Sequence, residues 1–101
     1  MAIDESLLAE LERRREEATR SGGPERIAKR HERGQLGARE RLDQLFAAHT
    51  FQEFGLHAQH QSRGFDMADK SLPTDGVITG LGFVDGRTVA SFSQDFMIAG
   101  G

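Results

Sequence analysis

The 101-residue sequence contains no cysteine, which excludes disulfide bonds, zinc–thiolate sites and cysteine nucleophiles. Its first residues, MAIDESLLAE, lack the basic stretch and apolar segment of a signal peptide, and no apolar run approaches the ~20 residues of a membrane-spanning helix. The formal net charge of −3 provides no excess of positive charge to attract nucleic acid or an anionic membrane. We therefore expect a cytoplasmic chain that has neither nucleic acid nor a membrane as a partner.

Charged and aromatic residues are unevenly distributed along the chain. Residues 1–50 contain ten acidic and ten basic side chains and one phenylalanine, whereas residues 51–101 contain six acidic and three basic side chains, six phenylalanines and eight of the twelve glycines. This composition indicates solvated helices in the first half and strands and turns in the second. At this length the chain is at most one domain, and we predict an α+β segment.

Helical periodicity predicts three helices, over residues 5–20, 24–33 and 38–48. Asp4 is placed to cap the first, and Pro24 suits the first position of the second. The apolar stripes are narrow, and their members are Ile3, Leu7, Leu11 and Ala18 in the first helix, Ile27 in the second, and Leu42, Leu45 and Phe46 in the third. We also expect two exposed i,i+4 ion pairs in the first helix, Glu10 with Arg14 and Glu16 with Arg20. A helix with so narrow an apolar stripe must lie on another surface to persist.

The run VITGLGFVDGRTVASFSQ predicts a β-hairpin, with strands over residues 76–84 and 87–94. Asp85-Gly86 forms the two-residue turn, since a type I′ turn needs φ > 0 at both positions. The expected pairs are Phe83 with Thr88, Leu81 with Ala90, and Thr79 with Phe92. One face then collects the apolar side chains Val77, Leu81, Phe83, Ala90 and Phe92. The other face carries Gly80 and Gly82, on which a helix or another backbone can lie. A short strand is expected near residues 53–59.

Two histidines, His57 and His60, are the candidate metal ligands. A zinc site needs three or four ligands, and the sequence offers no obvious third. On the strand expected here, residues three apart also point to opposite faces. We interpret both as ordinary surface histidines and predict no metal site.

Other residues have the types but not the spacing of functional motifs. The basic run Arg13 to Arg15 is balanced by four glutamates of the same helix, and stacking aromatics are missing from this half, so a solvated face is favoured over a nucleic-acid site. Ser91, Ser93 and Asp95 lack the G-x-S-x-G turn that positions a nucleophile. Gly22-Gly23 follows no strand and precedes no Lys-Ser/Thr pair, so it is interpreted as a helix stop.

The sequence ends FSQDFMIAGG. Glycine adopts φ > 0 freely, so Gly100-Gly101 is either a plain turn after a strand or backbone that a bulky ligand approaches closely. The residues within the chain leave both readings open.

Three ordered motifs resemble the N-terminus of the carboxyltransferase (β) subunits of biotin-dependent acyl-CoA carboxylases, the propionyl-CoA carboxylase β type above all. Residues 35–41, QLGARER, are similar to the family's G-K-L-[TS]-A-R-E-R; residues 75–80, DGVITG, to G-D-G-V-V-T-G; and residues 92–96, FSQDF, to F-S-Q-D-F. The similarity extends from about Leu8 to Gly101. Gly37 departs from the family's Ser or Thr, which removes a side-chain cap from the third helix, and a divergent loop near residues 63–72 leaves the substrate subtype open.

The resemblance implies a crotonase-like fold and transfer of carboxylate from carboxybiotin to the α-carbon of an acyl-CoA. It implies a helical N-terminal arm over residues 1–50, and the first strands of the crotonase-like N-terminal domain over residues 51–101. The chain is then expected to be a fragment that ends before the Gly-rich loops supplying oxyanion donors. We therefore predict no catalytic residue within it, and inactivity of the segment alone, but substrate-binding roles for Gly100 and Gly101.

The resemblance also implies partners. These are an acyl-CoA substrate, a biotin carboxylase or biotin carrier subunit that holds the biotin, and further copies of the full-length subunit in a homo-oligomer. Two alternatives stay open. The chain could be a free-standing interaction module that binds a protein through its apolar hairpin face, or part of a same-fold acyl-CoA decarboxylase.

Overall fold

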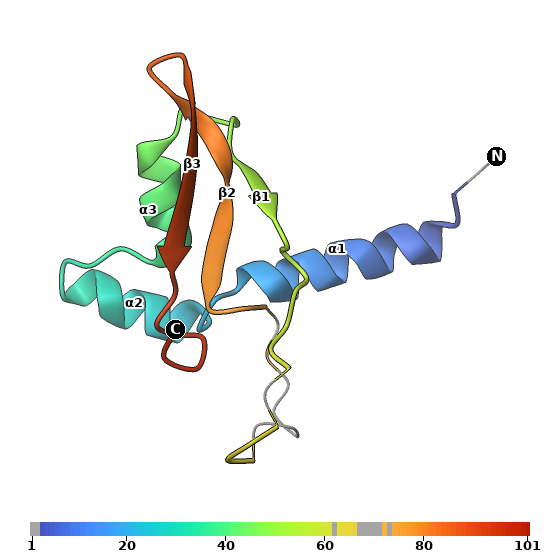
Figure 1. The fold of residues 1–101 in the computed structure, drawn as a ribbon. Coiled ribbons are helices and arrows are strands. Elements are labelled where there is room, and N and C mark those ends of the chain that lie inside the picture. The colour runs from blue at the N-terminus through green and yellow to red at the C-terminus, as the bar shows by residue number, and fades with distance from the viewer. Residues whose placement is uncertain (1–2, 62, 67–71, 73) are drawn as a thin grey trace.

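A computed structural model describes residues 3–61, 63–66, 72 and 74–101. In them, helices precede an antiparallel sheet with the strand order β1-β2-β3 (Figure 1). The elements are α1 (Glu5–Thr19), α2 (Pro24–Glu32), α3 (Ala38–Leu45), β1 (Gln52–Phe54), β2 (Val77–Val84) and β3 (Arg87–Gln94). The predicted helices and hairpin are all present, and the divergent loop near residues 63–72 lies partly outside the described residues.

The helix starts follow local rules that the sequence shows. The Asp4 carboxylate accepts the backbone N–H of Ser6 at 2.9 Å, which confirms the predicted cap of α1. Pro24 occupies the first turn of α2, as predicted. Gly37 provides no side-chain cap to α3, and the Glu40 carboxylate accepts the Gly37 N–H at 3.0 Å instead.

Helix α3 ends at Leu45, three residues before the predicted end. The backbone N–H of Ala47 donates to the carbonyl of Phe83 in β2 at 2.9 Å, so this amide is lost to the helix. The hydroxyl of Thr50 then accepts the N–H of Phe83 at 3.1 Å. These hydrogen bonds to β2 end the helix earlier than predicted. Helical periodicity in the sequence does not reveal such tertiary contacts.

The hairpin has the predicted register. Phe83 pairs with Thr88, Leu81 with Ala90 and Thr79 with Phe92, and Asp85 and Gly86 both have positive φ. The strand expected near residues 53–59 is wrong in extent, because β1 covers only Gln52–Phe54. Gly55 follows at φ 68° and its carbonyl accepts the N–H of Ala58 at 2.9 Å, so the backbone turns where the strand was expected to continue.

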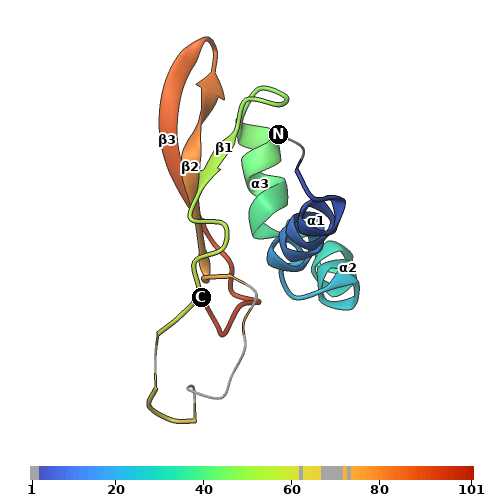
Figure 2. The same cartoon turned by 90° about the vertical axis from the view of Figure 1, so that its right-hand side faces the viewer.

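The helices lie on one side of the sheet, and none of the described helices covers the other side (Figure 2). Helix α3 makes the contacts with β2 and β3. The core is a cluster of four buried residues, with three partly buried ones packed against it: Ala38, Leu42, Phe46 and Ile78, and then Phe51, Val84 and Val89. The predicted flat face at Gly80 and Gly82 receives these side chains, since a Cβ on Gly82 would lie 2.5 Å from the Phe46 ring.

The opposite sheet face is apolar and exposed within the described structure. Its predicted members Phe83 and Phe92 are 49% and 74% exposed, and Phe54 of β1 joins them at 55%. Phe46 and Phe51 stack with ring centroids 5.4 Å apart on the helical side. Gly80 and Gly82 therefore lie on the side of the sheet that α3 covers, whereas Phe54, Phe83 and Phe92 lie on the exposed side.

Candidate functional site

The segment after β3 packs against two distant parts of the chain. The backbone N–H of Asp95 donates to the carbonyl of Gly76 at 2.7 Å, which holds the segment to the start of β2. Arg26 of α2 donates to the carbonyl of Met97 at 3.3 Å. A Cβ on Gly22 would lie 2.8 Å from the Met97 side chain. The turn between α1 and α2, interpreted from sequence only as a helix stop, is thus packed against the end of the hairpin.

Asp95 is the polar centre of this junction. It is 4% exposed, and its carboxylate accepts the hydroxyl of Ser21 and the backbone N–H of Met97, the latter at 3.0 Å. Burying a carboxylate is costly unless donors satisfy its oxygens, and here each oxygen has one. The sequence did not reveal this pairing, because Ser21 and Asp95 lie 74 residues apart.

Gly100 and Gly101 form a left-handed turn directly after this junction. Ala99, Gly100 and Gly101 have φ values of 48°, 75° and 84°, and the N–H of Gly101 donates to the carbonyl of Ile98 at 2.8 Å. Among the described residues other than its two chain neighbours, none has a heavy atom within 4 Å of a Cβ built on Gly100, whereas a Cβ built on Gly76 would lie 2.9 Å from the backbone of Gly101. The turn is therefore in contact with Gly76, while the described structure leaves space beside Gly100.

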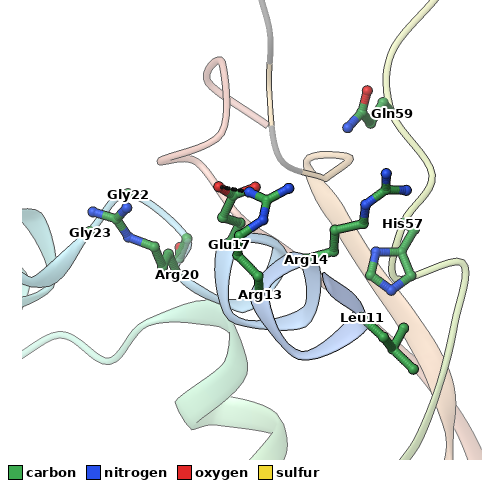
Figure 3. A pocket seen from close by; sticks show the side chains of 10 residues that line it. Leu11, Arg13, Arg14, Glu17, Arg20, Gly22, Gly23, His57 and Gln59 are labelled. Carbon is green, nitrogen blue, oxygen red and sulfur yellow. Dashed lines mark hydrogen bonds and ion pairs between the residues drawn. The ribbon is translucent and has the colours of Figure 1, made fainter. Parts of the chain in front are cut away.

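A surface hollow of about 790 Å³ lies between α1, the α1–α2 turn and the segment after β1 (Figure 3). Its charged lining residues are Arg13, Arg14, Glu17, Arg20 and His57. In Figure 3, Arg14 extends from α1 toward His57 and Gln59. Neither Gly100 nor Gly101 lines this hollow.

Most of the positive charge of the hollow is already compensated within α1. Arg13 contacts Glu10 and Glu17 at 2.7 Å each, and Arg14 contacts Glu10 at 2.9 Å, the predicted pair. Hydrogen bonds from Arg13 and Arg14 lower the pKa of Glu10 to about 2. This pattern is that of a solvated helix face, as the sequence indicated for the arginine run.

The other predicted pair of α1, Glu16 with Arg20, is not among the ion pairs of the described residues. Between α2 and α3, His31 contacts the Glu40 carboxylate at 2.8 Å. The hydrogen bond from the backbone of Gly37, and then that from His31, lowers the pKa of Glu40. These charges hold helices in place and form no catalytic pair.

The remaining sequence candidates are dispersed. His57 and His60 lie in the loop after β1 rather than on a strand, and the described residues contain no group of three or more metal-ligating side chains. The Ser93 hydroxyl donates to the carbonyl of Ala38 at 3.0 Å, while Asp95 bonds Ser21. Ser93 and Asp95 therefore join β3 to the helices. Of the helices described, none has the length and apolar character needed to cross a membrane.

Comparison with known proteins identifies the family. The model of the carboxyl transferase domain matches residues 29–101. The propionyl-CoA carboxylase carboxyltransferase subunit of Haloferax mediterranei is 47% identical over 97 residues, which are 96% of this chain and 19% of that protein. The methylmalonyl-CoA decarboxylase subunit alpha of Propionigenium modestum is 42% identical over 101 residues, all of this chain and 20% of that protein.

Solved structures agree with these relatives. A transcarboxylase 12S crystal structure, described as a hexamer assembly with methylmalonyl-coenzyme A and methylmalonic acid bound, superposes with a TM-score of 0.91 at 37% identity, over 99% of this chain and 19% of that one. A single-chain, multi-domain long-chain acyl-CoA carboxylase superposes with a TM-score of 0.78 at 26% identity, over 97% of this chain and 11% of that one. The chain spans about a fifth of the length of the curated relatives named above. It belongs to the carboxyl transferase domain family.

Proposed function

We propose that this chain is the N-terminal part of the carboxyltransferase subunit of a biotin-dependent acyl-CoA carboxylase. That subunit transfers carboxylate from carboxybiotin to the α-carbon of a short-chain acyl-CoA such as propionyl-CoA. The observation that carries the proposal is the 47% identity to a propionyl-CoA carboxylase carboxyltransferase subunit, which extends over 96% of the chain. In this proposal, residues 1–50 are a helical arm and residues 51–101 are the first strands of a crotonase-like domain.

Gly100 and Gly101 are the residues that we propose to lie beside the acyl-CoA. Their positive φ values and the open space around Gly100 suit backbone that a bulky thioester approaches. The enolate chemistry needs N–H donors where negative charge develops on the thioester oxygen. We assign no catalytic residue to this chain and expect those donors on later segments of the full-length subunit.

Biotin supplies the carboxylate to be transferred, and in this proposal a partner subunit or domain carries it. Arg13, Arg14 and Glu17 in the hollow at α1 are already paired within the helix, so we do not assign the biotin site to that hollow. A biotin carboxylase or carrier subunit and further copies of the carboxyltransferase subunit are the expected protein partners.

A decarboxylase subunit is the second candidate. The 42% identity to a methylmalonyl-CoA decarboxylase subunit, over all 101 residues, favours it nearly as strongly. Both reactions exchange carboxylate between biotin and an acyl-CoA and require a stabilised enolate. The present segment carries no residue whose geometry separates them.

Carboxylate transfer by the full-length subunit tests the proposal. The full-length subunit is incubated with carboxybiotin and propionyl-CoA, and separately with biotin and methylmalonyl-CoA, and the acyl-CoA products are separated by chromatography. We expect methylmalonyl-CoA in the first reaction, and no turnover by the isolated 101-residue chain, because losing a single oxyanion donor already lowers rates by ~10²–10³. Absence of transfer in both reactions with the full-length subunit would refute the proposal. Rapid turnover by the isolated chain would refute the proposal that it is an inactive part of a longer subunit.

A further inference from the structure

Ser21 adopts a backbone conformation that serine rarely takes. Its φ is 57°, in the left-handed region that non-glycine residues adopt at a cost in backbone energy. It lies in the turn between α1 and α2, and the next two residues are glycines. Since glycine would occupy this conformation without strain, we ask which contact the serine side chain makes.

The contribution that the structure shows is the hydrogen bond to Asp95. The Ser21 hydroxyl donates to one carboxylate oxygen of Asp95, and the backbone N–H of Met97 donates to the other at 3.0 Å. Asp95 is nearly fully buried, so its carboxylate has little access to water as a replacement donor. Removal of the hydroxyl would leave one oxygen without the partner that the structure gives it, which makes the contact a strong constraint.

A short chain of backbone hydrogen bonds connects Asp95 to the glycine turn. The carbonyl of Asp95 accepts the N–H of Ile98 at 3.1 Å, and the carbonyl of Ile98 accepts the N–H of Gly101 at 2.8 Å. Ile98 is itself buried, at 4% exposure. The side chain of Gln94, the residue before Asp95, donates to the carbonyl of Gly101 at 3.0 Å. The position of the turn therefore depends on the position of Asp95.

We propose that Ser21 and Asp95 are positioning residues that set the place of Gly100 and Gly101 against the acyl-CoA. The inference rests on the proposed function, because it assigns the glycine turn to the substrate. Neither side chain touches the substrate, and both act through the backbone turn. The helical arm thereby contributes to acyl-CoA binding through the partly buried hydrogen bond of Ser21, which lies 74 residues before Asp95 in sequence.

The expected effects are kinetic as well as structural. A displacement of a reacting group by about 1 Å can lower a rate by up to about 100-fold. We expect Ser21→Ala in the full-length subunit to raise the KM for propionyl-CoA, or lower kcat, by about tenfold. Asp95→Asn retains an acceptor for Met97 and an amide that can hydrogen-bond the Ser21 hydroxyl, so it should lose less activity than Asp95→Ala.

Ser93, in β3 and two residues before Asp95, provides a matched control. It is also buried, and its hydroxyl donates to the carbonyl of Ala38 at 3.0 Å, so Ser93→Ala likewise removes a bond between β3 and the helical arm. It has no hydrogen bond to the segment that carries the glycine turn among the bonds described. We expect Ser93→Ala to lower the Tm about as much as Ser21→Ala while changing KM and kcat by less than about twofold.

The experiment measures KM and kcat for propionyl-CoA, the Kd of propionyl-CoA by calorimetry, and the Tm of each variant. The inference is supported if Ser21→Ala, but not Ser93→Ala, changes KM, kcat or Kd. It also requires that the Ser21→Ala/Asp95→Ala double variant loses no more activity than the less active single variant. If Asp95→Ala does not fold, the kinetics and Kd of Ser21→Ala and Asp95→Asn test the inference instead. Unchanged kinetics and Kd in folded Ser21→Ala, or equal changes in Ser93→Ala, would overturn the inference while the unsubstituted subunit stays active. An inactive unsubstituted subunit would overturn the proposed function itself, and the inference with it.

Discussion

Helices α1 and α3 are stabilised in different ways. Helix α1 has 15 residues, of which Ala18 is buried, and it projects away from the sheet (Figure 1). Helix α3 has only 8 residues, yet Ala38 and Leu42 are buried in it and Phe46 follows them into the core. Since isolated helices shorter than about 12–15 residues are marginal in water, α3 depends on its contacts with the sheet. For α1 the sequence predicted support from another surface, but in the described structure Leu7 and Leu11 of its apolar stripe are 64% and 38% exposed. The described contacts of α1 are mainly its cap and its own ion pairs.

The family motif QLGARER belongs to the docked helix, and its charged residues have structural roles. Arg39 contacts the Glu53 carboxylate of β1 through two hydrogen bonds, of 2.6 and 3.0 Å. Arg41 donates to the carbonyl of Gln94 in β3 at 2.8 Å. Arg39 and Arg41 of the motif therefore join α3 to both outer strands of the described sheet.

The largest expected effect comes from removing the apolar contact of α3. Phe46→Ala leaves a cavity against β2 and should lower the free energy of unfolding by about 3–5 kcal/mol. Leu7→Ala on α1 is the matched substitution, and because Leu7 is 64% exposed it should cost less than about 0.5 kcal/mol. Urea unfolding of the chain, followed by far-ultraviolet circular dichroism, measures both. Equal losses would mean that α1 is docked as firmly as α3.

Substitutions of Arg39 in α3 and Arg13 in α1 compare the stability contributed by a partly buried ion pair and by exposed ones. Arg39 pairs with Glu53 in a partly buried site, with side-chain exposures of 23% and 14%, so Arg39→Met should cost about 1–3 kcal/mol, because the carboxylate loses its charged donor. Arg13→Met removes contacts to exposed glutamates and should cost at most about 1 kcal/mol. The same unfolding measurement at low and at high salt tests this. A salt-sensitive effect at Arg39 and a salt-insensitive one at Arg13 would contradict the assignment.

The smallest expected effect is the response of α1 to acid. The pKa of Glu10 is lowered from 4.5 to about 2, so its contribution to stability is present above pH 4.5 and is lost as the pH falls toward 2. Carboxyl-carbon NMR of Glu10 as a function of pH should show this titration, and high salt should move it back toward 4.5 because the site is exposed. A Glu10→Gln chain should lack the corresponding loss of helicity. A Glu10 titration near 4.5 at low salt would show that its ion pairs do not persist.

The sequence predicted local features well, and tertiary ones less completely. The caps, the Pro24 start and the Asp85-Gly86 turn are set by neighbouring residues, and their positions were correct. The ends of α3 and β1 were wrong, because Ala47 bonds to the sheet and Gly55 turns the chain. At the candidate site, Gly100 and Gly101 were chosen from sequence, and their role stays a prediction. Ser21 and Gly76 were missed, since their contacts join segments that are distant in sequence.

Valine substitutions in two glycine turns, at Gly100 and at Gly34, test most directly the central claim that Gly100-Gly101 lies beside the acyl-CoA. Gly100 and Gly34 have nearly equal φ values, 75° and 71°, and among the described residues other than chain neighbours no heavy atom lies within 4 Å of a Cβ on either. Valine therefore imposes similar backbone strain at both positions, but only position 100 lies in the proposed site. The measurement is kcat and KM for propionyl-CoA in full-length subunits carrying Gly100→Val or Gly34→Val. We predict a raised KM or lowered kcat for folded Gly100→Val, with Gly34→Val close to the unsubstituted subunit. Unchanged kinetics in a folded Gly100→Val subunit would contradict the claim.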